Sequence, residues 1–184
     1  MKINGEQTIA ATPDIVWRAL NDPEVLRQAI PGCKSLDRKN GNGYRATVET
    51  KIGPIKATFN GDVELSDLDP PHGYTLSGRG SAGSMGNAKG SAKVRLTPNG
   101  GGTKLTYDVD AEVTGKFAQL GSRLIQSTAG LLAGQFFDRF GEVVAGPSAK
   151  PEAPSRILRF RSWWIWAAVA LAAGVIIYLL LDNH

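Results

Sequence analysis

The 184-residue sequence predicts an α+β fold in which a curved antiparallel sheet surrounds a long C-terminal helix, followed by a C-terminal transmembrane helix. Three observations lead to this prediction. Two short helical patterns follow the first predicted strand, and several later segments alternate apolar with polar side chains. Residues 115–144 then place apolar side chains at helical spacing, so one long helix has an apolar stripe to bury.

The N-terminal elements are predicted from strand and helix-start signals. Residues 3–10 form the first predicted strand. In TPDIVWRALND, Thr12 is a good helix N-cap and Pro13 a good first helical residue. A second short helix is expected to begin at Asp22-Pro23 and to end before the turn at Pro31-Gly32.

The middle of the chain predicts antiparallel strands with one buried and one solvent-exposed face. Alternation of this kind runs through GYRATVETKI, PIKATFNGDVEL and TKLTYDVDAEV. The segments DLDPPHGY and TPNGGGT are expected to be hairpin turns. The carboxylates Asp62, Glu64, Asp108, Asp110 and Glu112 fall on the exposed face, where an acidic docking patch is an alternative to an ordinary solvated surface.

The closing segment is expected to be a single helix from about Gly115 to Val144. Its apolar positions recur at roughly helical spacing and are Phe117, Leu120, Leu124, Leu131 and Phe136. A curved sheet around this helix leaves a space between the two that is either a solid core or a ligand cavity. The Gly-, Ala- and Ser-rich segment 77–92 supplies few side chains to fill that space, which favours a cavity.

The domain resembles a known family. The segments VWRALNDPEVLRQAIPGCKSL, GYRATVETKIGPIKATFNGDVEL and GKFAQLGSRLIQSTAGLLAGQFFDRF resemble the G-subunit family of carbon monoxide dehydrogenase, within the START-like (SRPBCC) helix-grip superfamily. The resemblance implies a helix-grip fold and an accessory role beside a molybdenum-containing hydroxylase that oxidises carbon monoxide. It also implies a part in placing that enzyme at the membrane, and it brings no catalytic residues to carry over.

Other motifs indicate no catalytic or metal site. GRGSAG (residues 78–83) matches a dinucleotide-binding fingerprint, but no helix pattern follows it, so a flexible hairpin or a strand bend is expected. His72, His184 and Cys33 do not provide a metal-ligand set, and no base accompanies Cys33 as a nucleophile. We therefore expect a protein that is not an enzyme, with no catalytic residues, no metal and no tightly bound cofactor.

An apolar pocket between the sheet and the long helix is the expected ligand site. A respiratory quinone (ubiquinone or menaquinone) is the candidate ligand, because it is lipophilic and carries a few polar atoms. The residues expected to line the cavity are Val48, Ile52, Ile55, Phe59, Leu76, Met85, Leu105, Tyr107, Leu120, Leu124 and Leu131.

The C-terminal region predicts a membrane anchor. Residues 1–146 form the expected ligand-binding domain, 147–161 a Pro-rich basic linker, 162–181 a transmembrane anchor and 182–184 a tail. Aromatic residues expected at the membrane interfaces are Trp163, Trp164, Trp166 and Tyr178. The basic flank and the lack of an N-terminal signal segment predict a single-pass protein whose domain faces the cytoplasmic side of the bacterial inner membrane.

The net charge does not indicate nucleic-acid binding. Residues 1–148 contain 17 Lys and Arg against 15 Asp and Glu, so the domain is close to neutral. Much of the remaining basicity lies in the linker, where it can meet anionic lipid.

Three functions follow as expectations. The first is a membrane-anchored accessory protein that recruits a molybdenum-containing dehydrogenase complex and binds or shuttles a hydrophobic small molecule. The second is a maturation or assembly factor for the dehydrogenase that has no ligand. The third is a cyclase- or hydrolase-like enzyme, which fold analogy alone supports.

Overall fold

The computed structural model describes residues 1–39 and 41–146. Seven strands form one antiparallel sheet in the order β1-β7-β6-β5-β4-β3-β2. The strands are β1 Lys2–Ile9, β2 Cys33–Arg38, β3 Gly43–Ile52, β4 Ile55–Asp69, β5 Gly73–Ser81, β6 Asn87–Asn99 and β7 Gly102–Val113. The helices are α1 Pro13–Leu20, α2 Pro23–Ala29 and α3 Ser122–Ala145, with short 3₁₀ turns η1 Gly83–Met85 and η2 Gly115–Leu120.

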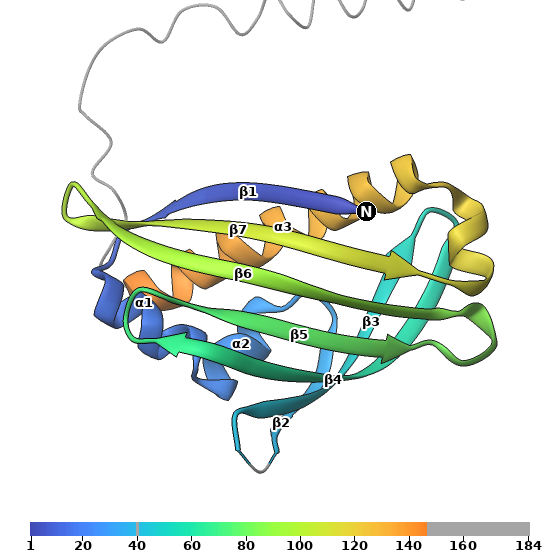
Figure 1. Cartoon of the computed structure of the whole chain (residues 1–184), viewed down its shortest axis with the longest axis horizontal. Coiled ribbons are helices and arrows are strands. Elements are labelled where there is room, and N and C mark those ends of the chain that lie inside the picture. Colours follow the sequence, from blue (N-terminus) through green and yellow to red (C-terminus); the bar gives the residue numbers. More distant parts are fainter. Residues whose placement is uncertain (40, 147–184) are drawn as a thin grey trace, which may run out of the picture. The chain divides into compact units, whose positions relative to one another are not determined.

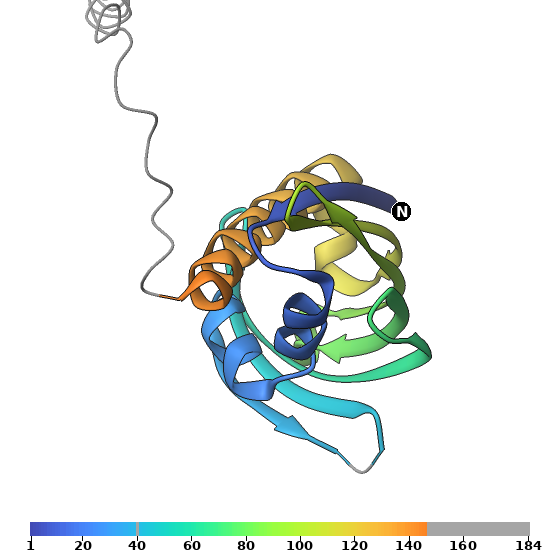
Figure 2. The same ribbon diagram turned by 90° about the vertical axis from the view of Figure 1, so that its left-hand side faces the viewer.

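The sheet curves around the helices. Figure 1 shows α3 crossing one face of the sheet, and Figure 2 shows α1, α2 and α3 together on its concave side. Consecutive strands from β2 to β7 are neighbours, whereas β1 reaches across to β7. The helices therefore line the inside of the curved sheet, and its convex face is left to solvent.

The predicted alternation corresponds to the two faces of the sheet. In β3 and β4, Tyr44 lies opposite Val63 and Val48 opposite Phe59, so apolar side chains meet on the concave face. Arg45 lies opposite Asp62 on the convex face. The alternating sequence segments are confirmed as strands, with faces set by the two-residue side-chain period.

The two short helices begin where the sequence predicts. Pro13 and Pro23 occupy first-turn positions of α1 and α2. The Asp22 side chain accepts a hydrogen bond from the Glu24 amide at 2.9 Å, which caps α2. Thr12 occupies the N-cap of α1 without a side-chain hydrogen bond, so Pro13 and the packing of α1 set that helix start.

The single helix expected from about Gly115 to Val144 is two elements. The 3₁₀ turn η2 ends at Leu120, and α3 begins at Ser122. Between them Gly121 has φ 84° and ψ 147°, which no helix accommodates. The apolar spacing crosses this break because Phe117, in η2, is fully buried against Phe59 at a ring-centroid distance of 5.2 Å.

The main core lies where α1 and α3 meet the sheet. Val16 of α1, Leu96 and Leu105 of the sheet, and Phe140 of α3 are buried in one cluster. The buried Thr103 hydroxyl donates to the Ala11 carbonyl at 2.6 Å. This contact ties the start of β7 to the turn before α1 and fixes the helical layer on the sheet.

The described part of the chain contains no helix that is long and apolar enough to cross a membrane. The predicted linker (147–161), anchor (162–181) and tail (182–184) lie outside the described residues.

Candidate ligand cavity

An apolar cavity lies between the concave face of the sheet and the helices. Its volume is about 380 Å³, and almost all of its lining surface is carbon. The lining residues come from α1, α2, α3 and β2 to β7: Leu20, Leu26, Ile30, Leu36, Tyr44, Ala46, Val63, Leu65, Tyr74, Leu76, Ala92, Val94, Leu105, Tyr107, Val109, Ala133, Phe136 and Phe137. The space between sheet and helix is therefore not completely filled by side chains.

Aromatic contacts hold the walls of the cavity in place. Tyr107 of β7 stacks on Phe137 of α3, with ring centroids 5.7 Å apart. Phe136 packs edge-on against Phe137 at 5.1 Å. On another side, Trp17 of α1 meets Tyr74 of β5 edge-on at 5.6 Å. Aromatic pairs of this geometry favour one arrangement of the rings, so helices and sheet are held at a defined separation.

Tyrosine hydroxyls are the polar side-chain groups of this wall. The Tyr44 hydroxyl donates to the Asn21 carbonyl at 3.1 Å. The Tyr74 and Tyr107 hydroxyls have no hydrogen-bond partner in the described part of the chain. Neither is a fully buried oxygen atom, because every fully buried side-chain polar atom of the described residues has a partner. Tyr74 is 7 % exposed, and its burial, with Tyr44 nearby, raises the pKa of its phenol. The Tyr74 hydroxyl therefore remains protonated at neutral pH and can donate to a ligand, whereas the Tyr107 hydroxyl lies over Gly5 of the neighbouring strand β1.

The structure brings some of the sequence-predicted cavity residues together here and places others elsewhere. Leu76, Leu105 and Tyr107 line the cavity. The others lie outside its wall: Val48, Ile52, Ile55, Phe59, Met85, Leu120, Leu124 and Leu131. Val48 and Phe59 pair across β3 and β4, and Ile52 and Ile55 flank the turn between those strands.

The part of the domain near that turn is packed by side chains. Phe59 stacks on buried Phe117. Leu124 packs closely over Gly53: a Cβ added to Gly53 would lie 2.9 Å from the Cδ2 atom of Leu124. Leu131, on α3, is 62 % exposed. The hydroxyls of Ser127 and Thr128 donate to the Leu124 carbonyl and are satisfied within the helix.

Several lining residues were not among those expected from the sequence. Leu26 lies in the second short helix and Ile30 is its C-cap residue, whereas Tyr74 lies in β5 and Val94 in β6. A usable signal was present, because Leu26 and Ile30 are four residues apart and so share one face. An apolar face on such a short helix needs an apolar partner, and here it closes the cavity.

The remaining candidate groups are not arranged for chemistry. No three His, Cys, Asp or Glu side chains cluster as metal ligands anywhere in residues 1–39 and 41–146. His72 lies in an exposed turn with its Nδ1 3.4 Å from an Asp69 carboxylate oxygen. Burial raises the pKa of the Cys33 thiol, an effect that Arg27 partly offsets, so the reactive thiolate is disfavoured.

The glycine-rich GRGSAG segment is part of the sheet. Gly78 to Ser81 pair with β4 on one side and β6 on the other. The segment continues into the 3₁₀ turn η1 and then into β6, which returns antiparallel. The segment therefore leads into the β5–β6 hairpin, one of the two expected alternatives, and this topology does not match a dinucleotide fingerprint, which requires a following helix.

Comparison with known proteins places this geometry in a family. The model of the CoxG family, the G subunit of carbon monoxide dehydrogenase, matches residues 5–145. A solved structure of a conserved protein from Geobacillus kaustophilus is 34 % identical, with a TM-score of 0.75, and the match covers 79 % of this chain and 95 % of that protein. None of the curated proteins compared with the chain matches it.

More distant structures share the fold. A protein from Thermus thermophilus is 20 % identical with a TM-score of 0.61, over 81 % of this chain and all of that one (100 %). Ara h 8.0201 is 19 % identical with a TM-score of 0.59, over 79 % of this chain and 99 % of that one. At such identities the likeness concerns the fold alone, which is the START/Bet v1-like helix grip.

Proposed function

Because the chain belongs to the CoxG family of carbon monoxide dehydrogenase, we propose that it acts as a membrane-anchored accessory protein of a molybdenum hydroxylase of the carbon monoxide dehydrogenase type. In this role it recruits the enzyme to the membrane and binds or shuttles a hydrophobic ligand, a respiratory quinone. The observation that carries the ligand part of the proposal is the apolar cavity with the Tyr74 hydroxyl as a hydrogen-bond donor in its wall.

The chemistry of the cavity suits a quinone. A quinone ring is flat and apolar on its faces, and its two carbonyl oxygens accept hydrogen bonds. The carbon-lined wall suits the ring, and the Tyr74 hydroxyl suits a carbonyl oxygen. A volume of about 380 Å³ falls within the usual range of ligand pockets, roughly 300–1,000 Å³. Such a site favours the head of a quinone, while a long isoprenoid tail extends beyond it.

The lining residues support binding rather than catalysis. In the described part of the chain the cavity wall contains no carboxylate, histidine, lysine or cysteine. Tyrosine is the one ionisable type in it, and burial raises the pKa of Tyr74 away from neutrality. General acid–base chemistry works best with a group that titrates near the operating pH, so a binding role is the better fit.

The sequence supports the membrane part of the proposal. The uncharged segment 163–181 is long enough to span a hydrocarbon core as a helix, and the arginines before it favour a cytoplasmic domain. A long-tailed quinone partitions into lipid, where a dehydrogenase dissolved in the cytoplasm does not reach it. A tethered cavity raises the effective concentration of binding site beside that lipid.

Quinone binding by the full chain, purified in detergent, tests the proposal. Calorimetric titration with short-tail ubiquinone and menaquinone analogues should show saturable binding to the native chain. Ala92→Phe places a ring into the cavity from β6 and should lower the affinity at least tenfold. Ser91→Phe adds the same ring on the exposed, opposite face of that strand and should leave affinity unchanged. No saturable binding by the native chain, or equal binding by both variants, would contradict a quinone site.

Deletion of the gene separates this role from an assembly factor. Without a quinone-linked recruiter, the dehydrogenase should remain active with artificial electron acceptors but should reduce respiratory quinone poorly. An inactive, cofactor-deficient dehydrogenase would instead support a maturation factor. Assays of the same cell extract with an artificial acceptor and with quinone distinguish the two results.

A further inference from the structure

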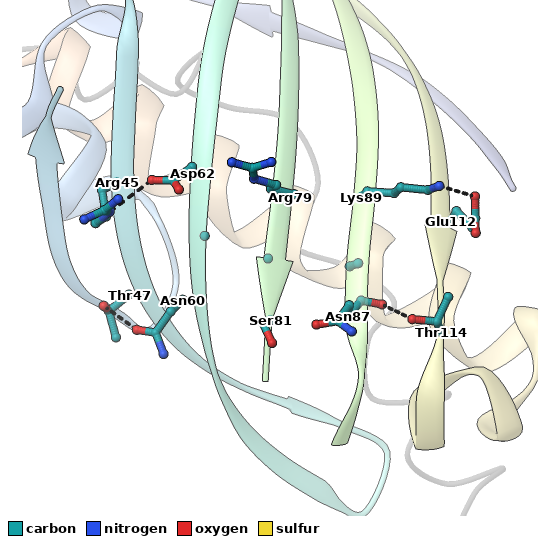
Figure 3. Close-up of a pocket in the computed structure, with 13 residues that line it drawn as sticks. Arg45, Thr47, Asn60, Asp62, Arg79, Ser81, Asn87, Lys89, Glu112 and Thr114 are labelled. Carbon is teal, nitrogen blue, oxygen red and sulfur yellow. Dashed lines mark hydrogen bonds and ion pairs between the residues drawn. The ribbon is translucent and has the colours of Figure 1, made fainter. Parts of the chain in front are cut away.

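A second hollow lies on the opposite, convex face of the sheet. It has a volume of about 680 Å³ and crosses five strands, β3 to β7 (Figure 3). We call it the outer trough, and its lining residues are Arg45, Thr47, Asn60, Gly61, Asp62, Arg79, Gly80, Ser81, Asn87, Ala88, Lys89, Glu112 and Thr114. The two hollows are on different faces, so the outer trough is separate from the quinone cavity.

The strand register aligns a row of charges across the outer trough. Arg45 lies opposite Asp62, and Asp62 lies opposite Arg79. Arg79 in turn lies opposite Lys89, and Lys89 opposite Glu112. The row therefore reads positive, negative, positive, positive, negative, and two cations face each other near its centre.

Both carboxylates of the row, Asp62 and Glu112, form ion pairs with cations other than Arg79. Asp62 accepts from Arg45 at 3.0 Å and from Lys39 at 3.3 Å, and these bonds lower the pKa of its carboxyl group. Lys89 turns away from Arg79 to Glu112, at 3.0 Å (Figure 3). Arg79 forms no ion pair with any residue of the described ranges.

The position of Arg79 is electrostatically unfavourable in the isolated domain. Like charges directly opposite each other on neighbouring strands are destabilising. Lys89 is opposite Arg79 in register on one side, and on the other side the carboxylate opposite Arg79, that of Asp62, already has two cationic partners. An arriving carboxylate would relieve this repulsion and form the two parallel hydrogen bonds for which guanidinium is suited.

A second row of side chains adds hydrogen-bond donors beside the charges. The Thr47 hydroxyl donates to the Asn60 side-chain oxygen at 2.9 Å, so the Asn60 amide nitrogen faces the trough with its hydrogens to give. Ser81 and Asn87 lie opposite each other on β5 and β6 at the same level. Such neutral groups suit a peptide backbone that runs along the trough next to a bound carboxylate.

Two glycines of the sheet lie where the neighbouring strand leaves no room for a side chain. Beta-carbons on Gly61 and Gly90 would lie 2.9 Å and 2.5 Å from carbonyl oxygens of the neighbouring strands. The strands beside the charged row therefore require glycine at these two positions.

We propose that the outer trough is the docking surface for an acidic segment of the partner dehydrogenase, with a carboxylate of that segment bound to Arg79. This inference rests on the proposed function, because it takes the dehydrogenase as the partner. A protein segment fits better than a free small anion, since one exposed guanidinium in water holds a small anion weakly. A protein partner excludes water over the whole trough and strengthens that single contact.

Affinity of the purified dehydrogenase complex for the full chain in lipid nanodiscs tests the docking surface. Arg79→Gln should raise the Kd for the complex at least tenfold, which is a common cost for a central interface arginine. Arg95→Gln is the matched control, because Arg95 is exposed on β6, outside the trough, and loses the same charge. The control should change Kd by less than twofold.

A cross-linking measurement locates the contact directly. In the Arg79→Lys variant a carbodiimide should join the introduced amine to an aspartate or glutamate of the dehydrogenase, and mass spectrometry would identify both peptides. Thermal melts and quinone titrations of each variant should match those of the native chain, which separates lost docking from lost folding.

The outcomes separate the docking inference from the proposed function. Equal dehydrogenase binding by native chain and Arg79→Gln, with no cross-link at position 79, would overturn the docking surface and leave recruitment standing. No binding of the dehydrogenase to the native chain would overturn recruitment itself, and the docking inference with it. If Arg79→Gln instead weakens binding of the chain to phosphatidylglycerol vesicles alone, the trough faces lipid and the protein-docking inference is wrong.

Discussion

At the scale of single residues, the cavity tyrosines differ in what their hydroxyls do. Tyr44 is committed to the fold, since its hydroxyl donates to the Asn21 carbonyl after α1. Tyr74 lies close to it, and burial, with Tyr44 nearby, raises the pKa of the Tyr74 phenol. One ring thus closes the helix–sheet contact, and the other remains available to a ligand.

Replacing these tyrosines separately should divide binding from stability. Tyr74→Phe removes a donor from the cavity and should weaken binding of a short-tail quinone by about threefold to tenfold, as expected for one neutral hydrogen bond. Its thermal midpoint should stay near that of the native chain. Tyr44→Phe leaves the Asn21 carbonyl without this donor and should lower the free energy of unfolding by about 1 kcal/mol. Urea titration and calorimetry check the pair, and equal losses of quinone affinity in both variants would contradict this division.

At the scale of elements, the junction between η2 and α3 separates the cavity from the packed end of the domain. Phe117 is buried and holds η2 in the core. The chain changes direction before α3, and α3 places Phe136 and Phe137 in the cavity wall. Gly121 lies between them with backbone angles that only glycine adopts readily. The change of direction at this residue lets one apolar stripe serve two different packing surfaces.

Two glycine-to-alanine variants test that junction. Gly121→Ala meets no neighbouring atom within 4 Å but forces alanine into a positive φ, so it should destabilise the domain by about 1–3 kcal/mol. Gly130→Ala, inside α3 and equally free of contacts, should stabilise it by about 0.5–1 kcal/mol. Urea unfolding of both variants measures these changes. A stable Gly121→Ala protein would mean that the break in the helix comes from packing alone.

The elements also show why sequence patterns predict the fold better than the site. Alternation assigned Val48, Phe59 and Leu105 to the concave face, because a two-residue period determines the side of a sheet. It carries no information on distance along a strand. Whether a concave-face residue meets Phe117 or the cavity depends on where η2 and α2 cross the sheet, and those crossings come from contacts distant in sequence.

At the scale of the whole molecule, the two faces of the sheet have different functions in the proposed role. The concave face and helices enclose an apolar cavity, and the convex face carries the outer trough. Both can be occupied at once, since the strands separate them. A ligand and a partner enzyme can therefore bind the same domain without competing for side chains.

The proposed membrane attachment concerns the full chain and is tested on it. The full chain should float with phosphatidylglycerol-containing vesicles in a density gradient and resist high salt. A chain that ends at residue 146 should stay at the bottom. A chain that ends at residue 161 keeps Arg156, Arg159 and Arg161 and should bind only at low salt, at about 1 kcal/mol per basic residue near the surface. Flotation of the chain that ends at residue 146 would contradict the proposed anchor.

The pairing of β1 with β7 has a consequence for synthesis. Residues 2–9 pair with residues 103–110. The first strand therefore remains unpaired during synthesis until the last strand has been made. The helices α1 and α2, completed early, have no closed surface to pack on during that interval. The domain therefore closes late in translation, after β7 and α3 have been made. A slow step placed between residues 113 and 146 would lengthen the time during which the apolar cavity wall is exposed to chaperones.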